Sequence, residues 1–435
     1  MSVLSPDLRA RALDAVAPLR LGRVAELLGL RLRITGLAAA VGDLVSVEGE
    51  RGAVVLAEVA ASGPGGLTCL PLGSTTGLRV GDVVRHTGGP LLVRVGDELR
   101  GRVLDGLGRP LDGGPSLDHL PQVGVSQAAP AALSRPRIDH QVGLGVRALD
   151  ALTPCGRGQR IGIMAGSGVG KSSLLSMVAR GTDAEVSVIA LIGERGREVR
   201  EFIDNDLGPE GLARSVVVVA TSDAPPVERL RAAAVATRVA EHFRDSGKHV
   251  VLMMDSLTRV AMAQREIGLS AGEPPATRGY PPSVFTLLPQ LLERAGTSPT
   301  GSITGLYTVL VEGDDMQDPI GDTARSILDG HVVLSRRLAT AGHFPSIDVL
   351  ESISRVTGSV TDVAQRADAT RLRRLLAAHR SVRELVEIGA YVAGADPDAD
   401  VALARMPAID AFLRQGMDEP SDLATTWQSL RELVA

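Results

Sequence analysis

Residues 165–172 read Ala-Gly-Ser-Gly-Val-Gly-Lys-Ser, a combination suited to binding phosphate groups. Glycines let the backbone curl so that several N–H groups point at one anion, while a closing lysine reaches the outer phosphates and the next hydroxyl ligates Mg²⁺. The strict pattern has glycine where this chain has alanine, and a flexible glycine and serine turn is the alternative. The preceding apolar run and the following helical pattern favour the phosphate-binding interpretation. We therefore predict nucleoside triphosphate binding, with Ser172 as the Mg²⁺ ligand, by Ala165, Gly166, Ser167, Gly168, Val169, Gly170, Lys171, Ser172 and Ser173.

Two carboxylates follow apolar segments elsewhere in the chain and could complete a hydrolytic site. Asp255 ends the run at 249–254, and we expect it to orient Mg²⁺ from the edge of a sheet where ligands bind. A helix N-cap is the alternative role for it. Glu194 follows the run at 186–192 and could polarise the attacking water, with Arg195 beside it for the γ-phosphate. A solvated cluster of surface charges remains the alternative for this pair.

These side chains need strands that end at one edge of a sheet. Apolar segments separated by helical patterns predict such strands, and their alternation indicates an α/β fold with a largely parallel sheet covered on both faces. The predicted strands are 160–165, 186–192, 215–220, 249–254, 303–311 and 331–335.

The regions on either side of this sheet have different patterns. Between residues 22 and 95, short apolar alternations with glycine-containing turns about every ten residues predict a small β-barrel. Residues 6–17 have a helical pattern, which indicates either an arm that binds a partner or a helix packed on its own domain. Helical leucine and alanine spacing dominates 363–386 and 399–414. We expect an arm at 1–18, a barrel at 19–96, a nucleotide-binding domain at 97–362 and a helical domain at 363–435.

Composition limits the classes of function. The 435 residues carry a formal net charge of −5, which gives no electrostatic reason for tight binding to nucleic acid or to an anionic membrane. Two distant cysteines and the lack of a secretory signal or of a long apolar run favour the cytoplasm. Residues 22–95 contain no Trp, Tyr or Phe on which bases could stack, which argues against an RNA translocase.

Several blocks of sequence resemble the catalytic subunits of the rotary ATPase superfamily, namely 158–172, 192–199 and 254–259. Further blocks are similar to the flagellar protein export ATPases of type III secretion, namely 263–269, 279–285, 311–315 and 326–331. The resemblance implies a RecA-like P-loop NTPase domain between a small β-barrel and a C-terminal helical domain. It also implies Mg²⁺-dependent ATP hydrolysis, and alanine is the usual residue of these proteins at position 165.

The same resemblance assigns roles to individual residues. It implies that Lys171 is the catalytic lysine, Ser172 the Mg²⁺ ligand, Glu194 the general base and Asp255 the aspartate at the end of a buried strand. Arg355 resembles an arginine finger that reaches the nucleotide of a neighbouring subunit. Phe344 falls where an aromatic residue, more often tyrosine, stacks on adenine, although core packing is an alternative for this ring.

The resemblance finally implies an assembly. We expect a homohexameric ring with active sites between subunits, held at the inner face of the cell membrane by partners. Those partners would be a regulator bound to the N-terminal arm, a coiled-coil stalk in the pore, an export gate and substrate–chaperone complexes. The favoured hypothesis is that the protein serves export of unfolded flagellar subunits. The alternatives are the injectisome ATPase, a catalytic subunit of a proton-translocating rotary ATPase, and a noncatalytic ring subunit, which usually lacks the glutamate found at 194.

Overall fold

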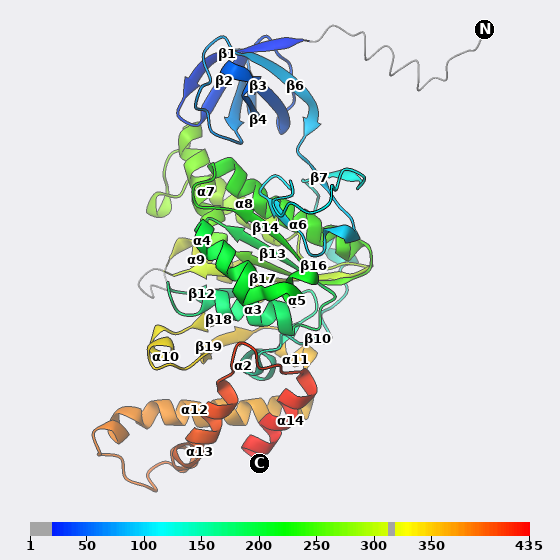
Figure 1. Cartoon of the computed structure of the whole chain (residues 1–435). Helices are drawn as coiled ribbons and strands as arrows, with labels where there is room; N and C mark the ends of the chain where they lie inside the picture. The colour runs from blue at the N-terminus through cyan, green and yellow to red at the C-terminus, as the bar shows by residue number, and fades with distance from the viewer. Residues whose placement is uncertain (1–19, 312–317) are drawn as a thin grey trace, which may run out of the picture. The chain divides into compact units, whose positions relative to one another are not determined.

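The computed structural model describes residues 20–311 and 318–435, and the chain divides into two compact units. The first unit ends at Leu91 and the second begins at Leu92. Figure 1 shows the elements in chain order. The arm predicted at 1–18 and the residues 312–315 of one resembling block lie outside the described residues.

The first unit is a closed β-barrel, as predicted. Its strands follow the order β1-β2-β5-β4-β3-β6. The barrel interior is aliphatic, since alternate residues such as Ile34, Val45 and Val59 are fully buried. Gly66 allows the tight β4–β5 connection, because a side chain there would lie 2.2 Å from the Ile34 carbonyl oxygen. The strands are β1 (Leu21–Leu28), β2 (Arg31–Thr35), β3 (Asp43–Glu48), β4 (Val54–Gly63), β5 (Gly66–Pro71) and β6 (Val83–Pro90).

The second unit contains a large and mostly parallel sheet. Within the described part of the chain it has nine strands, eight of them in the order β19-β18-β12-β17-β15-β13-β14-β8. β19 pairs antiparallel with β18, and the short β16 pairs antiparallel with β17. All six predicted strands are present, whereas the edge strands β8 and β19 were not predicted. The strands are β8 (Val103–Asp105), β12 (Arg160–Ala165), β13 (Val186–Ile192), β14 (Ser215–Ala220), β15 (His249–Asp255), β16 (Gly296–Thr297), β17 (Ser302–Leu310), β18 (Gly330–Leu334) and β19 (Ile347–Ser354).

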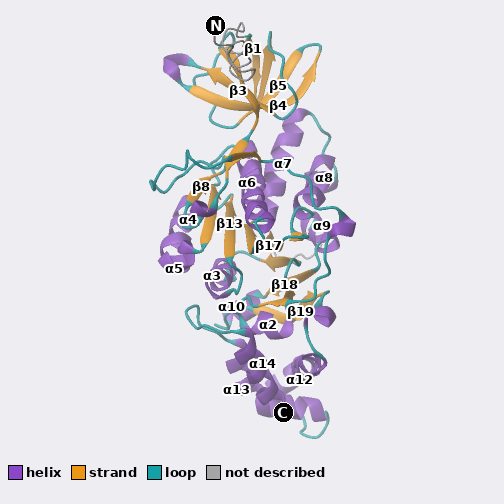
Figure 2. Ribbon diagram, turned by 90° about the vertical axis from the view of Figure 1, so that its right-hand side faces the viewer, coloured by secondary structure: helices purple, strands orange, loops and turns teal. Residues whose placement is uncertain are grey.

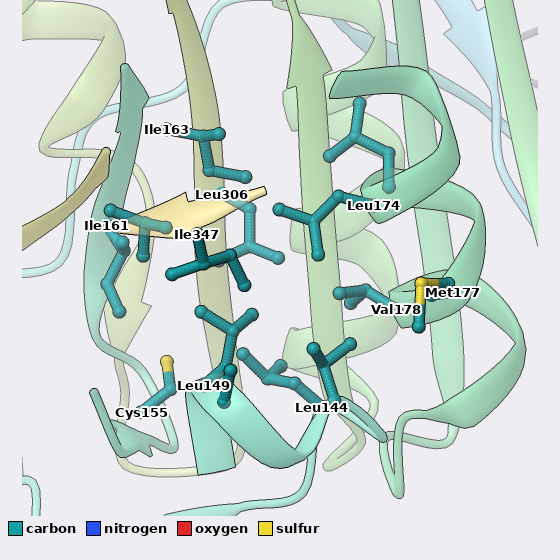
Figure 3. Packing of buried hydrophobic residues seen from close by; sticks show 14 of the residues in the cluster. Leu144, Leu149, Cys155, Ile161, Ile163, Leu174, Met177, Val178, Leu306 and Ile347 are labelled. Carbon is teal, nitrogen blue, oxygen red and sulfur yellow. The ribbon is translucent and has the colours of Figure 1, made fainter. Parts of the chain in front are cut away.

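Helices pack against this sheet, as the alternation of patterns predicted. Leu174 and Val178 of α3 join Ile163 and Leu306 of neighbouring strands in one buried cluster, which Figure 3 shows from close by. Figure 2 shows the strands flanked by helices. The helices before the C-terminal segment are α2 (Arg147–Leu152), α3 (Lys171–Gly181), α4 (Gly196–Glu201), α5 (Gly208–Ala213), α6 (Pro226–Asp245), α7 (Leu257–Ala271), α8 (Pro282–Leu292), α9 (Pro319–Ile327), α10 (Arg336–Thr340) and α11 (Thr357–Val360).

The C-terminal segment is helical, as its leucine and alanine spacing predicted. It forms α12 (Val363–Glu387), α13 (Pro397–Leu413) and α14 (Leu423–Val434). Phe412 and Trp427 belong to the same buried cluster as Leu149 of α2, so these helices share the core of the nucleotide-binding sheet. No helix among the described residues is long and apolar enough to span a membrane.

The compact units of the structure are not the same divisions as the predicted domains, whose limits stay predictions. The second unit begins at Leu92 rather than at residue 97. The reason is that β7 (Leu92–Arg94) pairs with β9 (Gln122–Gly124) instead of with the barrel. Residues 363–435 are also not a separate compact unit, because they bury their apolar side chains against the sheet domain.

Candidate nucleotide site

The loop between β12 and α3 has the geometry of an anion-binding turn. Gly168 and Gly170 have φ angles of 75° and 92°, in a region that residues other than glycine rarely adopt. α3 begins at Lys171, and no side chain caps its N-terminus. The N–H groups of a first helical turn have no partner within the helix, and they carry a partial positive charge. This end of α3 is therefore suited to a phosphate group.

Lys171 lies between the two predicted carboxylates. Its Nζ donates to Asp255 Oδ1 at 2.5 Å and to Glu194 Oε1 at 3.1 Å. The Asp255 side chain is buried, with an exposed fraction of 2%, and the side chains of Lys171 and Glu194 are mostly buried, with exposed fractions of 12% and 18%. Residues that are far apart in the chain thus meet beside the phosphate loop.

The order of the strands explains this meeting. β12, which leads into the phosphate loop, and β13, which leads to Glu194, are separated in the sheet by β17 and β15. Asp255 is the last residue of β15 and lies opposite Leu191 of β13. Since these strands are parallel, their carboxyl ends share one edge. Ser256, and not Asp255, caps the following helix α7, so the N-cap alternative for the aspartate does not apply.

Burial and charge act in opposite directions on the two titrating groups of this cluster. For Lys171, burial favours the neutral amine, but attraction to Asp255 and Glu194 outweighs it and raises the pKa above its ordinary value. For Glu194, burial raises the pKa, and attraction to Lys171 offsets only part of that effect. The lysine is therefore cationic, and the glutamate is a stronger proton acceptor than an exposed glutamate.

The donor set suits Mg²⁺ held together with a nucleotide. Ser172 is exposed at the first turn of α3, next to Lys171. The described residues contain no cluster of three or more His, Cys, Asp or Glu side chains that could hold a metal alone. Mg²⁺ commonly binds through one or two protein oxygens plus phosphate oxygens and waters, so one hydroxyl and the nearby Asp255 carboxylate fit it.

Phe344 lies beside the phosphate loop. A methyl group built on Gly170 would lie 3.4 Å from Cδ1 and Cε1 of its ring. The ring is 46% exposed, which does not fit the alternative of ordinary core packing. Ser346 is buried in the same segment, and its hydroxyl donates to the Val169 carbonyl oxygen at 2.5 Å.

The two predicted arginines are not part of the buried cluster. Arg195 has a side chain that is 79% exposed, and it pairs with Glu198 at 3.0 Å. Arg355 is exposed and donates to the Arg325 carbonyl oxygen at 3.2 Å. It follows the end of β19, where Ser354 pairs with Gly330 at the start of β18. Because β18 runs parallel to β12, Arg355 lies at the opposite edge of the sheet from the phosphate loop of its own chain.

Two residues near the site were not predicted from the sequence. The hydroxyl of Thr308 on β17 donates to Asp255 Oδ1 at 2.8 Å and so holds that carboxylate. The side chain of Arg259 packs on Gly193, just before Glu194, and its buried Nε has no partner among the described residues. A threonine within an otherwise apolar strand and an arginine one helical turn after Asp255 are the sequence signals that could have identified them.

Comparisons with known proteins agree across the whole chain. The ATP synthase alpha/beta family matches with its nucleotide-binding domain at residues 145–354 and its beta-barrel domain at 33–88, and the T3SS EscN ATPase C-terminal domain matches 361–432. The flagellum-specific ATP synthase of Bacillus subtilis is 50% identical over 95% of both chains. The type 3 secretion system ATPase of Xanthomonas euvesicatoria is 49% identical over 95% of this chain and 93% of its own. The assembled ATPase EscN of enteropathogenic E. coli, solved in complex with its central stalk EscO, is 44% identical with a TM-score of 0.88, over 95% of this chain and all of that one.

Proposed function

We infer the function of this chain from its family: it belongs to the flagellum-specific ATP synthases and type III secretion ATPases, within the ATP synthase alpha/beta family. It is accordingly an ATPase. The observation that carries the assignment of its site is the buried cluster of Lys171, Glu194 and Asp255 beside the phosphate loop.

We propose the following roles in hydrolysis. The loop N–H groups and Lys171 hold the triphosphate, and Glu194 accepts a proton from the attacking water. Ser172 and Asp255 hold and orient Mg²⁺, which when bound neutralises charge on the phosphate oxygens. The raised pKa of Glu194 supports its role, because a more basic carboxylate removes a proton from water more readily.

Positive charge for the transition state comes, in this proposal, from several arginines. We assign Arg259 to the γ-phosphate because its side chain packs on Gly193 next to Glu194 and its buried Nε has no partner among residues 20–311 and 318–435. Arg195 would reach the nucleotide only after leaving Glu198. Arg355 is exposed at the far edge of its own sheet, so we assign it to the nucleotide of a second copy, as expected for a homohexameric ring.

Phe344 is the proposed contact for adenine. Its half-exposed ring lies over Gly170 at the end of the phosphate loop, where a base attached to a bound triphosphate can stack. The phenylalanine retains the stacking face of the more common tyrosine.

We propose that hydrolysis serves protein export through a flagellar type III apparatus. Identities of 50% to a flagellum-specific enzyme and 49% to a type 3 secretion system ATPase keep the injectisome as a second candidate. The proposed partners are a central stalk, a regulator bound to the N-terminal arm, an export gate and substrate–chaperone complexes. The protein would then work in the cytoplasm at the inner face of the membrane.

Two measurements test this proposal. The purified chain should hydrolyse ATP in the presence of Mg²⁺, with specific activity that rises steeply with protein concentration, because each site needs Arg355 of another copy. Specific activity that is independent of concentration in a protein shown to be monomeric would contradict the shared site. Deleting the gene and restoring it with a Glu194→Gln variant should abolish secretion of flagellin, whereas loss of virulence substrates alone would favour the injectisome.

A further inference from the structure

The segment that follows α13 contains a buried glutamine with an unusual set of partners. Gln415 is 5% exposed. Its Nε2 donates to the carbonyl oxygens of Gly145 at 2.8 Å and Glu419 at 2.9 Å, and its Oε1 accepts from the Arg147 N–H at 2.9 Å. The side chain therefore joins the C-terminal segment to the start of the nucleotide-binding domain.

The backbone of the same residue is bonded to the proposed adenine contact. The N–H of Gln415 donates to the carbonyl oxygen of Phe344 at 3.0 Å. On its other side, the Phe344 segment is tied to the phosphate loop by the hydrogen bond from Ser346 to Val169. The backbone that carries the Phe344 ring is thus held by two hydrogen bonds, one to the phosphate loop and one from the C-terminal segment.

Two arginines fix the remainder of this segment. Arg147 at the start of α2 pairs with Glu419 and donates to the carbonyl oxygen of Phe412 at 2.9 Å. Arg180, near the end of the phosphate-loop helix α3, pairs with Asp418 at 2.7 Å. Residues 412–419 are therefore held by the start of α2 and by the C-terminal end of α3, and Gln415 lies in the middle of this segment.

We propose that Gln415 is a positioning residue for the nucleotide base. It fixes the Phe344 carbonyl through its own N–H, and its side-chain amide holds that N–H in place. This inference rests on the proposed adenine contact and adds that affinity for the base, but not for the phosphates, depends on the C-terminal segment. Losing the side chain removes the hydrogen bonds to the carbonyl oxygens of Gly145 and Glu419 and from the Arg147 N–H, which loosens the support of Phe344.

The test compares a nucleotide with a ligand that has no base. In the full-length Gln415→Ala variant we expect KM for ATP and the inhibition constant for ADP to rise about three- to tenfold, because part of the free energy of the three lost hydrogen bonds appears as weaker binding of the base. We expect kcat and the inhibition constant for inorganic pyrophosphate to stay within about twofold, since pyrophosphate occupies only the phosphate loop. Gln428→Ala is the matched control, because Gln428 is exposed on α14 and contacts Glu432; it should leave all four constants unchanged.

A double variant tests the route through Phe344. Adding Gln415→Ala to Phe344→Ala should raise KM less than Gln415→Ala does alone, because the ring that it positions is already gone. If Gln415→Ala does not fold, Gln415→Glu keeps the volume and the acceptor for Arg147 but replaces the donor to Gly145, and it should give the same pattern.

Three results would overturn the inference. They are an unchanged KM, an equal loss of pyrophosphate and ADP binding, and full additivity with Phe344→Ala. A wild-type protein that hydrolyses no ATP would instead contradict the proposed function, so the two failures can be told apart.

Discussion

The two edges of the main sheet in the second unit differ in how they carry charge. At the carboxyl ends of β13 and β15, Glu194 and Asp255 are buried and share the ammonium group of Lys171. At the opposite edge, the side chain of Arg355 is exposed after β19 and donates to the carbonyl oxygen of Arg325. The two edges are separated by the length of a strand, roughly 15–20 Å, and an arginine side chain cannot span that distance.

The first edge holds a cluster of residues that one chain brings together by itself, whereas the second edge carries a residue that we assign to the site of another copy. A buried cluster of opposite charges is stable only when its partners are present, so the first edge must be assembled within the chain. An exposed guanidinium costs little to leave in water and can bind an external anion. We therefore expect substitutions in the Lys171, Glu194 and Asp255 cluster at the first edge to affect folding and chemistry together, and substitution of the exposed Arg355 at the second edge to affect chemistry alone.

The largest effect is expected from Arg355→Ala. In assembled protein it should lower kcat by about three to five orders of magnitude, the contribution of an arginine finger in phosphoryl transfer. The free energy of unfolding should change by less than about 0.5 kcal/mol, because the side chain is exposed. Steady-state hydrolysis and urea denaturation measure the two quantities.

A mixing experiment shows whether Arg355 acts between copies. Arg355→Ala subunits mixed with Lys171→Ala subunits form hybrid interfaces that contain one intact lysine and one intact arginine. Some activity should return at intermediate ratios. Absence of rescue in mixtures that demonstrably co-assemble would contradict action in trans.

Glu194→Gln at the buried edge comes next. It should lower kcat by about two to four orders of magnitude, the usual contribution of a general base. ATP binding should persist, since glutamine keeps an oxygen that can accept from Lys171. Equilibrium binding of a fluorescent ATP analogue, measured beside turnover, tests this expectation, and normal turnover would refute the role of Glu194 as base.

Thr308→Val and Thr304→Val compare the two edges along a single strand. Both threonines are fully buried on β17, but Thr308 holds Asp255, whereas Thr304 bonds the backbone of Gly156 and Gly158. Each substitution should cost about 1–3 kcal/mol of stability through lost buried hydrogen bonds. Only Thr308→Val should also lower kcat, by about tenfold; an equal loss of kcat in Thr304→Val would mean that the effect is purely structural.

The smallest expected effect is a dependence on pH. Hydrolysis needs ionised Glu194, and burial raises its pKa above the ordinary 4.5, so kcat should begin to fall at a higher pH than for an exposed glutamate. Stability changes in the opposite direction. The folded state holds this proton more tightly than the unfolded state, so the contribution of Glu194 to stability decreases as pH rises above 4.5. A pH–rate profile and denaturation of wild type and Glu194→Gln over the same range separate the two effects.

The sequence predicted those parts of the structure that depend on local pattern. Long apolar runs marked the central strands, and polar residues directly after them marked Asp255 and Glu194 as neighbours at one edge. The curled backbone of the phosphate loop was likewise predicted from its glycines, two of which have positive φ angles in the structure. The α/β fold class and the small β-barrel were also predicted from local pattern, and the structure confirms both.

What the sequence did not predict depends on contacts between distant segments. β8 has three residues and β19 mixes buried with exposed positions, so neither has the apolar run of a central strand. The insertion of β17 between β12 and β15, which brings Thr308 to Asp255, follows from strand order and not from spacing. Gln415 could not be identified because three of its four hydrogen bonds, those to Gly145, Arg147 and Phe344, join residues remote in the chain, up to 270 positions away.

β19 has a consequence for a ring of the proposed kind. The strand begins just after Phe344, beside the chain's own phosphate loop, and ends just before Arg355, which we assign to the next copy. In such a ring, the residues on either side of this strand of eight residues would contact two successive nucleotides. Any sliding or tilting of this strand when adenine binds at one end would move the guanidinium at the other.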